Sequence, residues 1–224
     1  MKKTILNIVA IAATSLLATS CQQKTHEQMA KNNNDSILAE NIQLVIIAEE
    51  QSSANNKAYA QKAKEENHKH VANMFTAKAK ADSIRAEGHK KTLAKIVDPA
   101  KLAAKPAPKA VVPKTTPENL KQSINDDEYQ ITIAYPNYIE QAVMAGDSLT
   151  ITTLQWAVDG RENDQQYAQD ALKSVANNGN DMAVSQIWFV CPQCGSISDS
   201  ISMAGTQSCN QCGMMENDFI VIGK

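Results

Sequence analysis

The sequence is poor in aromatic residues, which make up 4% of its 224 positions. Large sandwiches and barrels draw on aromatic and β-branched residues, so this composition argues against a sizeable all-β domain and favours helices. A basic surplus is missing too, because 22 Lys and Arg residues are set against 24 Asp and Glu residues. A protein that clamps nucleic acid needs such a surplus, and we therefore expect no nucleic-acid partner.

Several signatures of common enzyme classes are also absent. The sequence contains no P-loop, no Gly-x-Gly-x-x-Gly and no Gly-x-Ser-x-Gly elbow, so nucleotide binding and serine hydrolysis are not indicated. What is present is a hydrophobic fraction of 43%, which suffices for a packed core. The length allows one medium-sized domain and a second, small one.

The N-terminus has the pattern of a secretory signal. Lys2 and Lys3 precede an apolar run over 5–18, which is shorter than the ~20 residues that span a bilayer. The run ends in Leu-Ala-Thr-Ser-Cys21, which resembles a bacterial lipobox with Cys21 as the lipidated residue. We expect a signal peptide at 1–20 and a flexible tether at 21–35, on a protein anchored by lipid to the membrane of the cell envelope, on the periplasmic or outer-membrane side. An uncleaved anchor and ordinary signal cleavage are the alternatives.

Helical periodicity dominates the middle of the chain. Apolar residues recur at helical spacing, and caps or breakers bound the segments. The expected helices cover 36–66, 69–96, 116–145 and 148–177. A stretch at 98–117 contains five prolines and is predicted to be an extended crossover, while Pro136 is expected to bend the third helix. The sequence thus predicts a four-helix bundle over 36–180.

A compact cysteine motif follows the bundle. Two Cys-x-x-Cys-Gly sequences place Cys191 and Cys194 before Cys209 and Cys212. Four thiolates in this arrangement are typical of a tetrahedral metal site, which we assign to a small domain at 187–224. Two alternatives remain open at this point: a zinc ion that only holds the small domain together, and a pair of disulfides in an exported protein.

The order of a helical bundle, Trp-Phe-Val-Cys-Pro-Gln-Cys-Gly and a second Cys-x-x-Cys-Gly resembles the rubrerythrin family. Further matching stretches are 58–66 in the first hairpin, and 118–120 and 135–138 in the third helix. The resemblance implies a mainly α fold: a ferritin-like bundle plus a rubredoxin-like β domain with one iron per four-cysteine site. It also implies peroxide reduction at a di-iron centre, a redox partner protein and a homodimer.

The di-iron ligands of that family are mostly replaced. The family pattern of one Glu on the first helix, Glu-x-x-His on the second and paired Glu on the third falls on Glu49, on Asp82 and Arg85, and on Asp127 and Gln130. On the fourth helix, the Glu and His positions of the family's Glu-x-x-His motif fall on Gly160 and Asn163. His89 lies one turn beyond the second-helix motif. Arginine has no acceptor atom, so we expect Arg85 to neutralise a remnant of Glu49, Asp82 and Asp127, and we expect no conventional di-iron centre.

These observations lead to two functional hypotheses. The first is an electron-transfer protein with a four-cysteine iron centre, linked to peroxide and oxidative-stress defence. The second is a non-enzymatic envelope scaffold or interaction protein whose four cysteines hold a structural zinc. The sequence leaves open whether the chain is an enzyme; as one, it would be a peroxide-reducing oxidoreductase of the rubrerythrin type.

Overall fold

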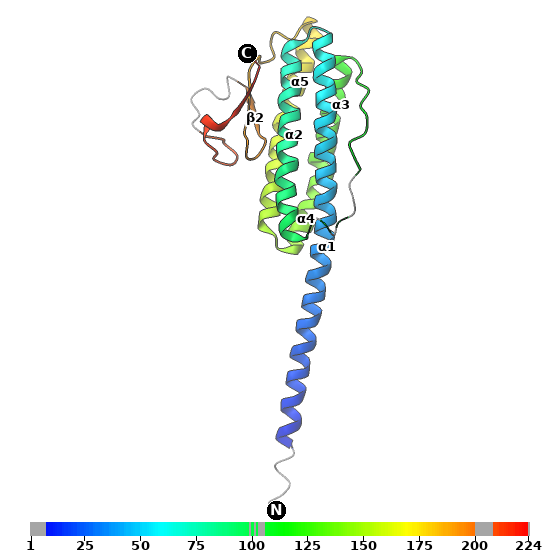
Figure 1. Ribbon diagram of the computed structural model, residues 1–224, viewed down its shortest axis with the longest axis vertical. Helices are drawn as coiled ribbons and strands as arrows, with labels where there is room; N and C mark the ends of the chain where they lie inside the picture. Colours follow the sequence, from blue (N-terminus) through cyan, green and yellow to red (C-terminus); the bar gives the residue numbers. More distant parts are fainter. Residues whose placement is uncertain (1–7, 99, 101, 103–105, 200–207, 224) are drawn as a thin grey trace, which may run out of the picture.

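The computed structural model describes the backbone of residues 8–98, 100, 102, 106–199 and 208–223; the side chains of 8–28, 30, 178 and 216 are not described. A helical bundle forms the body of the molecule, and a small β unit lies against its side near one end (Figure 1). The fold is therefore mainly helical with a C-terminal sheet, as the sequence predicts.

The first two helices form a long hairpin. Helix α1 spans Ile8–Glu65 and helix α2 spans Lys69–Ile96, and Asn67 adopts a positive φ of 66° in the turn between them. Helix α1 begins before the expected start at 36 and also covers 21–35, the stretch that the sequence analysis assigns to a tether. The reason is that no Gly or Pro precedes Gly88, and Gln, Lys, Glu, Met and Ala all favour helix.

The predicted signal segment is only partly described. Residues 1–7 and the side chain of Cys21 lie outside the described residues. Among the residues that are described, no helix carries an apolar stretch of the length and hydropathy that crossing a membrane requires.

The second half of the bundle follows the proline-rich crossover. It comprises α3 (Thr116–Tyr129), the π-helical turn η2 (Gln130–Ala134), α4 (Tyr135–Ala145) and α5 (Ser148–Asn178). The Asp147 side chain caps α5 by accepting from the N–H of Thr150 at 3.0 Å. The third helix expected at 116–145 is therefore interrupted, and the π turn lies directly before Pro136, whose missing N–H disturbs a regular helix at this point.

The bundle core has a polar layer between two apolar clusters. One cluster lies near the α1–α2 turn and includes Phe75, Leu120 and Trp188. The other lies at the opposite end and includes Ile42 and Leu154. Along the long helices the buried charged residues mostly fall between the segments that supply these clusters, although Lys78 lies among residues of the first cluster. The polar layer is thus enclosed on both sides by close-packed side chains.

The C-terminal unit is a three-stranded antiparallel sheet. Its strands are β1 (Trp188–Val190), β2 (Ile197–Asp199) and β3 (Ile220–Ile222), in the order β2-β1-β3, and the short 3-10 helix η3 (Glu216–Asp218) precedes β3. Trp188, Val190 and Ile197 belong to the same apolar cluster as the bundle. The sheet therefore shares a core with the helices.

Candidate metal centre and buried charge cluster

The four cysteines of the C-terminal unit converge on one point. The Sγ atoms of Cys191, Cys194, Cys209 and Cys212 all lie within 4.8 Å of one another. The Sγ separation is 3.5 Å between Cys191 and Cys212 and 3.6 Å between Cys194 and Cys209, and all four thiols are free. Tetrahedral coordination with metal–sulfur bonds of ~2.3 Å places sulfurs about 3.8 Å apart. The cluster can therefore hold a metal, and in this structure none of the four thiols is joined in a disulfide.

The backbone around the sulfurs favours their charged form. The N–H of Ser196 lowers the pKa of Cys194, and the N–H groups of Cys212 and Gln211 do the same for Cys209. The neighbouring thiols Cys191 and Cys209 nevertheless raise the pKa of Cys194, whereas Cys191 and Cys194 lower that of Cys209, and burial raises that of Cys212 to about 11. Four thiolates at this spacing consequently require a cation between them.

The first cysteine turn lies directly on α2. Gly195 has a φ of +74°, and a Cβ atom at this position would lie 2.7 Å from the carbonyl oxygen of Ala81. Only glycine combines this conformation with so close an approach. The Gly195 carbonyl then accepts a hydrogen bond from Arg85 Nη1 at 3.3 Å. At the second turn, Gln211 Nε2 donates to the carbonyl of Trp156 on α5 at 2.7 Å.

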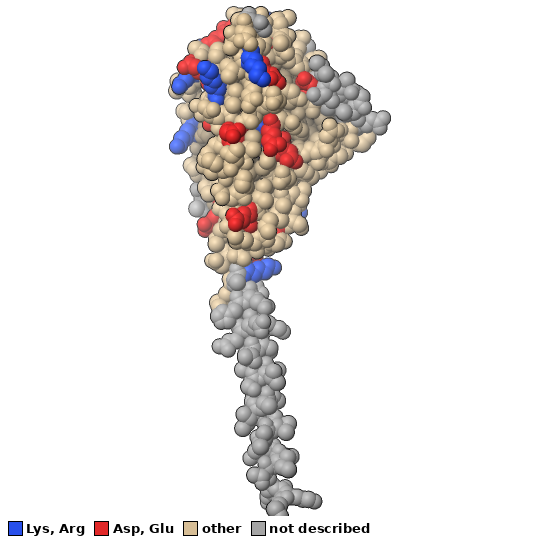
Figure 2. Space-filling view, turned by 180° about the vertical axis from the view of Figure 1, so that it is seen from behind, with Lys and Arg blue, Asp and Glu red and all other residues tan. Residues whose placement is uncertain are grey.

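Arg85 also belongs to a cluster of charges inside the bundle. The face in Figure 2 is mostly uncharged, with basic and acidic side chains scattered over it, whereas the polar layer of the core holds seven charged groups in contact. Each of these residues is at most 3% exposed. The cluster consists of four carboxylates and three cations: Glu49, Asp82, Asp127, Asp164, Lys78, Arg85 and Arg161.

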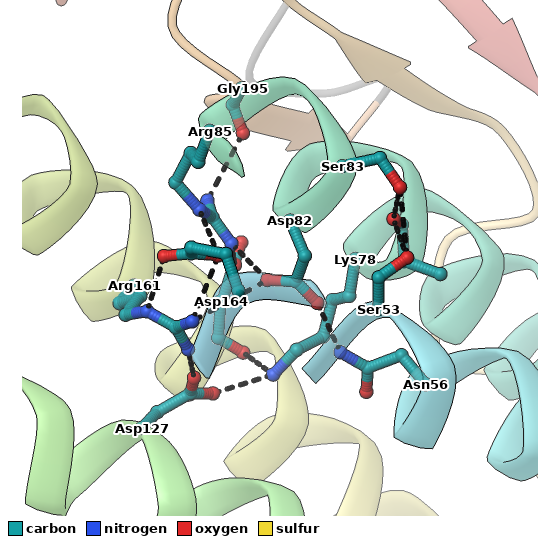
Figure 3. A network of polar contacts seen from close by, with 12 residues as sticks. Ser53, Asn56, Lys78, Asp82, Ser83, Arg85, Asp127, Arg161, Asp164 and Gly195 are labelled. Atoms are coloured by element: carbon teal, nitrogen blue, oxygen red, sulfur yellow. Dashed lines mark hydrogen bonds and ion pairs between the residues drawn. The ribbon is translucent and has the colours of Figure 1, made fainter. Parts of the chain in front are cut away.

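The two arginines lie between the carboxylates (Figure 3). Arg85 Nη2 lies 2.6 Å from Asp82 Oδ1 and 2.8 Å from Asp164 Oδ2, and its Nε lies 3.4 Å from Glu49 Oε2. Arg161 Nη2 contacts Glu49 Oε2 at 3.0 Å, and its Nη1 contacts Asp127 Oδ1 at 2.8 Å. Every carboxylate therefore faces at least one guanidinium, as buried charges require.

Lys78 and two neutral side chains complete the cluster. Lys78 Nζ donates to Asp127 Oδ2 at 2.6 Å and to Ser123 Oγ at 2.8 Å. Asn56 Nδ2 donates to Asp82 Oδ2 at 2.8 Å, and the Tyr135 hydroxyl donates to Glu49. These hydrogen bonds satisfy most of the carboxylate lone pairs and ammonium protons that have no arginine partner.

The protonation of the carboxylates follows from their neighbours. Burial by itself raises the pKa of Glu49, but Arg161, Arg85 and the Tyr135 hydroxyl together lower it below the ordinary value. Burial raises the pKa of Asp164 to about 6, against the effect of Arg85 and Lys78 and with that of Asp127. One oxygen of Asp164 has no hydrogen-bond partner, which agrees with its weaker stabilisation as an anion.

Four of the five positions expected on the first three helices meet in this cluster. Glu49, Asp82, Arg85 and Asp127 are all within it, whereas Gln130 is part-buried in the π turn and outside it. Lys78 and Tyr135 were not anticipated. Lys78 lies one helical turn before Asp82 on the inward face of α2, so its position was readable from helical spacing.

The expectation for the fourth helix is wrong by one residue. Asn163 is exposed, and Gly160 only flanks the cluster, where a Cβ would lie 3.0 Å from Arg85 Nη1. Arg161 and Asp164 occupy the interior instead. Spacings of three and four residues could have identified them, because the buried face of α5 runs through Leu154, Ala157, Arg161, Asp164, Ala168, Ala171 and Val175.

Comparisons with known proteins agree with this architecture. The rubrerythrin family model matches residues 40–162. Rubrerythrin-2 of Clostridium acetobutylicum is 24% identical over 164 residues, covering 72% of this chain and 83% of that protein. The solved structure of fully reduced, all-ferrous nigerythrin superposes with a TM-score of 0.72 at 22% identity, covering 82% of this chain and 86% of the other.

A ferritin is similar over a smaller part of the chain. The open-pore ferritin of Archaeoglobus fulgidus has a TM-score of 0.54 at 17% identity, and the match covers 65% of this chain and 88% of the ferritin. The ferritin-like bundle and the C-terminal four-cysteine unit are thus both accounted for. Since the family model matches more than half of the sequence, the chain belongs to the rubrerythrin family.

Proposed function

We propose that this protein is an electron carrier of the cell envelope, built on the rubrerythrin fold, with one iron in its four-cysteine centre and an ion-pair cluster where relatives bind two irons. The observation that carries the proposal is the pairing of a complete thiolate site with a bundle interior already filled by Lys78, Arg85 and Arg161. The cysteine spacing and the similarity to all-ferrous nigerythrin support iron in the thiolate site.

The four cysteines fit a thiolate-bound iron. Cys191 and Cys194 are buried at 0% and 3% exposure, so they keep water from most of the centre. The N–H groups of the two cysteine turns face the sulfurs and spread their negative charge. Iron held this way exchanges one electron between its ferric and ferrous states. The Gly195 carbonyl connects the first turn to Arg85, which holds positive charge at the centre's inner side.

The bundle interior does not fit a di-iron centre. In di-iron carboxylate bundles two helices supply one Glu each and two supply Glu-x-x-His. Here the corresponding i, i+3 pairs are Asp82 with Arg85 and Arg161 with Asp164, so one member of each pair is a guanidinium. A guanidinium has no lone pair for a metal and repels a second cation. Peroxide chemistry at two irons is therefore not part of the proposal.

Metal analysis of the purified full-length protein tests both halves of the proposal. We expect one iron per chain and visible thiolate-to-iron absorption that bleaches when dithionite is added. Two further irons per chain would contradict the assignment of the bundle, and a colourless protein containing zinc would contradict the electron-carrier function. The second outcome would instead support the envelope scaffold. This function is the rival candidate because the C-terminal unit packs into the core of the bundle, an arrangement that a purely structural zinc would also stabilise.

A designed variant supplies the positive control for metal counting. The variant keeps Glu49 and introduces the remaining carboxylate and histidine ligands of a di-iron bundle. It also replaces Lys78, the cation that would otherwise remain in the site. We expect this protein, but not the wild type, to bind two additional irons. Its substitutions are Lys78→Leu, Asp82→Glu, Arg85→His, Asp127→Glu, Arg161→Glu and Asp164→His.

The location and partners of the protein form the last part of the proposal. The lipobox-like sequence ending at Cys21 supports export and a lipid anchor, and relatives of this fold suggest a homodimer and a redox partner protein. Labelling with a radioactive fatty acid in a bacterial host should mark the wild type and spare Cys21→Ser. Equal labelling of both proteins would contradict the anchor.

A further inference from the structure

A cavity of about 510 Å³ lies beside the cysteine centre. Its walls come from α2, from the first part of α5 and from the first cysteine turn, including Cys194. The Arg85–Gly195 and Gln211–Trp156 hydrogen bonds fix the C-terminal unit against both helices, so the walls are held in place. Its volume is in the range of sites that bind small molecules.

His89 forms part of the inner wall of this cavity and has no partner. The side chain is 1% exposed, and neither ring nitrogen makes a hydrogen bond. The groups facing it are Arg85, Arg161 and the ring of Tyr135, whose centroid lies 6.4 Å from that of His89. Burial and the two arginines lower the pKa of His89 to about 3. The imidazole is therefore neutral and offers one donor and one acceptor, which buried polar groups rarely leave unused.

The remaining lining residues are a mixture of apolar, polar and charged side chains, and among the charged ones three lysines outnumber one acidic residue, Glu87. Ile84, Leu149 and Trp156 supply apolar surface, including one indole ring. Lys91 and Lys95 are exposed at the rim, and among the described ion pairs none involves either of them. A rigid apolar body with a negative charge at its outer end matches this distribution.

We propose that this cavity binds a small planar aromatic anion, with a hydroxyl or carbonyl group hydrogen-bonded to His89 and its anionic group at Lys91 and Lys95. The aromatic body lies against Trp156, beside Cys194. The cavity borders the buried charge cluster at Arg85 and the cysteine centre at Cys194, but the proposal uses neither as a ligand contact and holds whichever metal the cysteines bind. It depends only on the cavity, the unpaired imidazole and the basic rim.

The probe for the test is 6-hydroxy-2-naphthoate, which carries a hydroxyl and a carboxylate at opposite ends of a flat ring system. Calorimetric titration of the metal-loaded full-length protein should give saturable binding at one site per chain. Two shorter probes separate the contributions: 2-naphthoate lacks the hydroxyl, and 2-naphthol lacks the carboxylate. Each should bind about five- to tenfold more weakly, the effect expected for one hydrogen bond or one exposed charge contact.

Variants locate the binding. His89→Leu should weaken binding of 6-hydroxy-2-naphthoate about five- to tenfold and leave 2-naphthoate unchanged. Lys91→Gln with Lys95→Gln should weaken both carboxylates and leave 2-naphthol unchanged. The matched control is Lys57→Gln with Lys64→Gln, which removes the same charge at a different cavity between α1 and α2.

His89→Leu is suitable because leucine has a similar size and removes the unpaired polar atoms, so the variant should fold. Binding that is absent, that exceeds one site per chain, or that is equal in the wild type and both cavity variants would overturn the proposal. Equal weakening by the control pair would do the same, because it would show a non-specific attraction to surface lysines.

Discussion

Arg85 contacts both parts of the molecule. Its guanidinium lies among Glu49, Asp82 and Asp164, and the same group donates to the Gly195 carbonyl next to Cys194. Because these contacts are buried, water screens them little. A positive charge so placed stabilises the more negative, reduced form of a thiolate-bound iron.

Replacing Arg85 should therefore shift the reduction potential of an iron bound at the four cysteines, as proposed above. We expect Arg85→Gln to lower the potential and to destabilise the protein by about 3–5 kcal/mol, because three carboxylates lose a buried counter-charge. Arg85→Lys should recover most of the potential. Spectroelectrochemical titration measures the first effect and urea unfolding the second.

Arg161→Gln is the matched control for this prediction. It removes the same charge from the same cluster, but among the described residues Arg161 bonds to Glu49 and Asp127 and not to the cysteine turn. It should destabilise the protein similarly and shift the potential less. Equal shifts in the two variants would show that the Gly195 contact has no special role.

As the pH falls, the contributions of Asp164 and His89 to the stability of the fold change in opposite directions. Burial raises the pKa of Asp164 to about 6, so its protonation stabilises the fold at low pH, and this contribution is lost as the pH rises through 6. Burial lowers the pKa of His89 to about 3, so its contribution is present above the ordinary histidine pKa and is lost as the pH falls. The two effects largely cancel in the wild type between pH 5 and 6.5.

Comparison with Asp164→Asn isolates the aspartate. We expect the free energy of unfolding of the wild type, relative to this variant, to increase by about 1 kcal/mol between pH 7 and pH 5, because only the wild type gains a proton on folding. Glu49 does not interfere, since its pKa lies below the ordinary range. Chemical unfolding at both pH values measures the difference, and an unchanged or reversed difference would refute the assignment.

At the scale of elements, the π turn η2 aligns two parts of one helix with the cluster. Asp127 and Tyr135 both reach Glu49 or its arginine partner, although they are eight residues apart. At about 100° per residue, eight residues of regular α-helix leave them about 80° apart, whereas seven leave only about 20°. The turn takes up one residue and so brings Tyr135 onto the face of Asp127.

Deleting one residue from this turn should be tolerated. Removal of Ile133, which is 51% exposed, should convert η2 to regular helix, keep Tyr135 on the inner face and change the free energy of unfolding by less than about 1 kcal/mol. The control is deletion of the exposed Gln155 in α5, which rotates the following residues by about 100° and should unfold the protein. Thermal melts followed by circular dichroism distinguish the two, and equal damage would disprove the role of the turn.

Much of this layout could be predicted from the sequence, for reasons that differ between elements. The bounds 69–96 of α2 follow from a turn at Asn67 and a regular apolar face, and α5 follows from the Asp147 cap. Gln130 and Gly160 were placed wrongly because alignment to a distant ligand pattern fixes register poorly, and a one-residue error turns a helix by about 100°. The periodicity of α5 itself was the better guide.

The N-terminal helix and the contact of Gly195 with α2 were beyond local reasoning. The first depends on the absence of breakers over a long polar stretch, in which propensity alone favours helix only weakly. The second depends on how a small domain packs on a helix more than a hundred residues earlier in the chain, and no spacing rule encodes that. The cysteine site was predictable because its ligands are local.

At the scale of the whole molecule, we expect folding of the C-terminal unit to depend on a metal at its four cysteines and folding of the bundle to be independent of it. The unit has three strands of three residues each and cannot enclose a core alone. We expect Cys191→Ser with Cys209→Ser to abolish metal binding and expose residues after 186 to proteolysis, while most helical circular dichroism remains. Cys21→Ser, which removes a thiol elsewhere, is the control, and loss of the helical signal in the double variant would contradict this independence.

The buried charge cluster also constrains how the sequence can change over time. Seven charged groups interact with one another without access to water. Replacing any one of them leaves its neighbours without a buried counter-charge and costs about 3–5 kcal/mol. This is a large part of the total free energy of unfolding of a protein, which is about 5–15 kcal/mol. Drift at these positions is therefore slow and must be concerted. A variant that gained one ligand of a di-iron centre at these positions would lose stability before it gained the next, so single substitutions cannot convert this interior into a metal site without a destabilised intermediate.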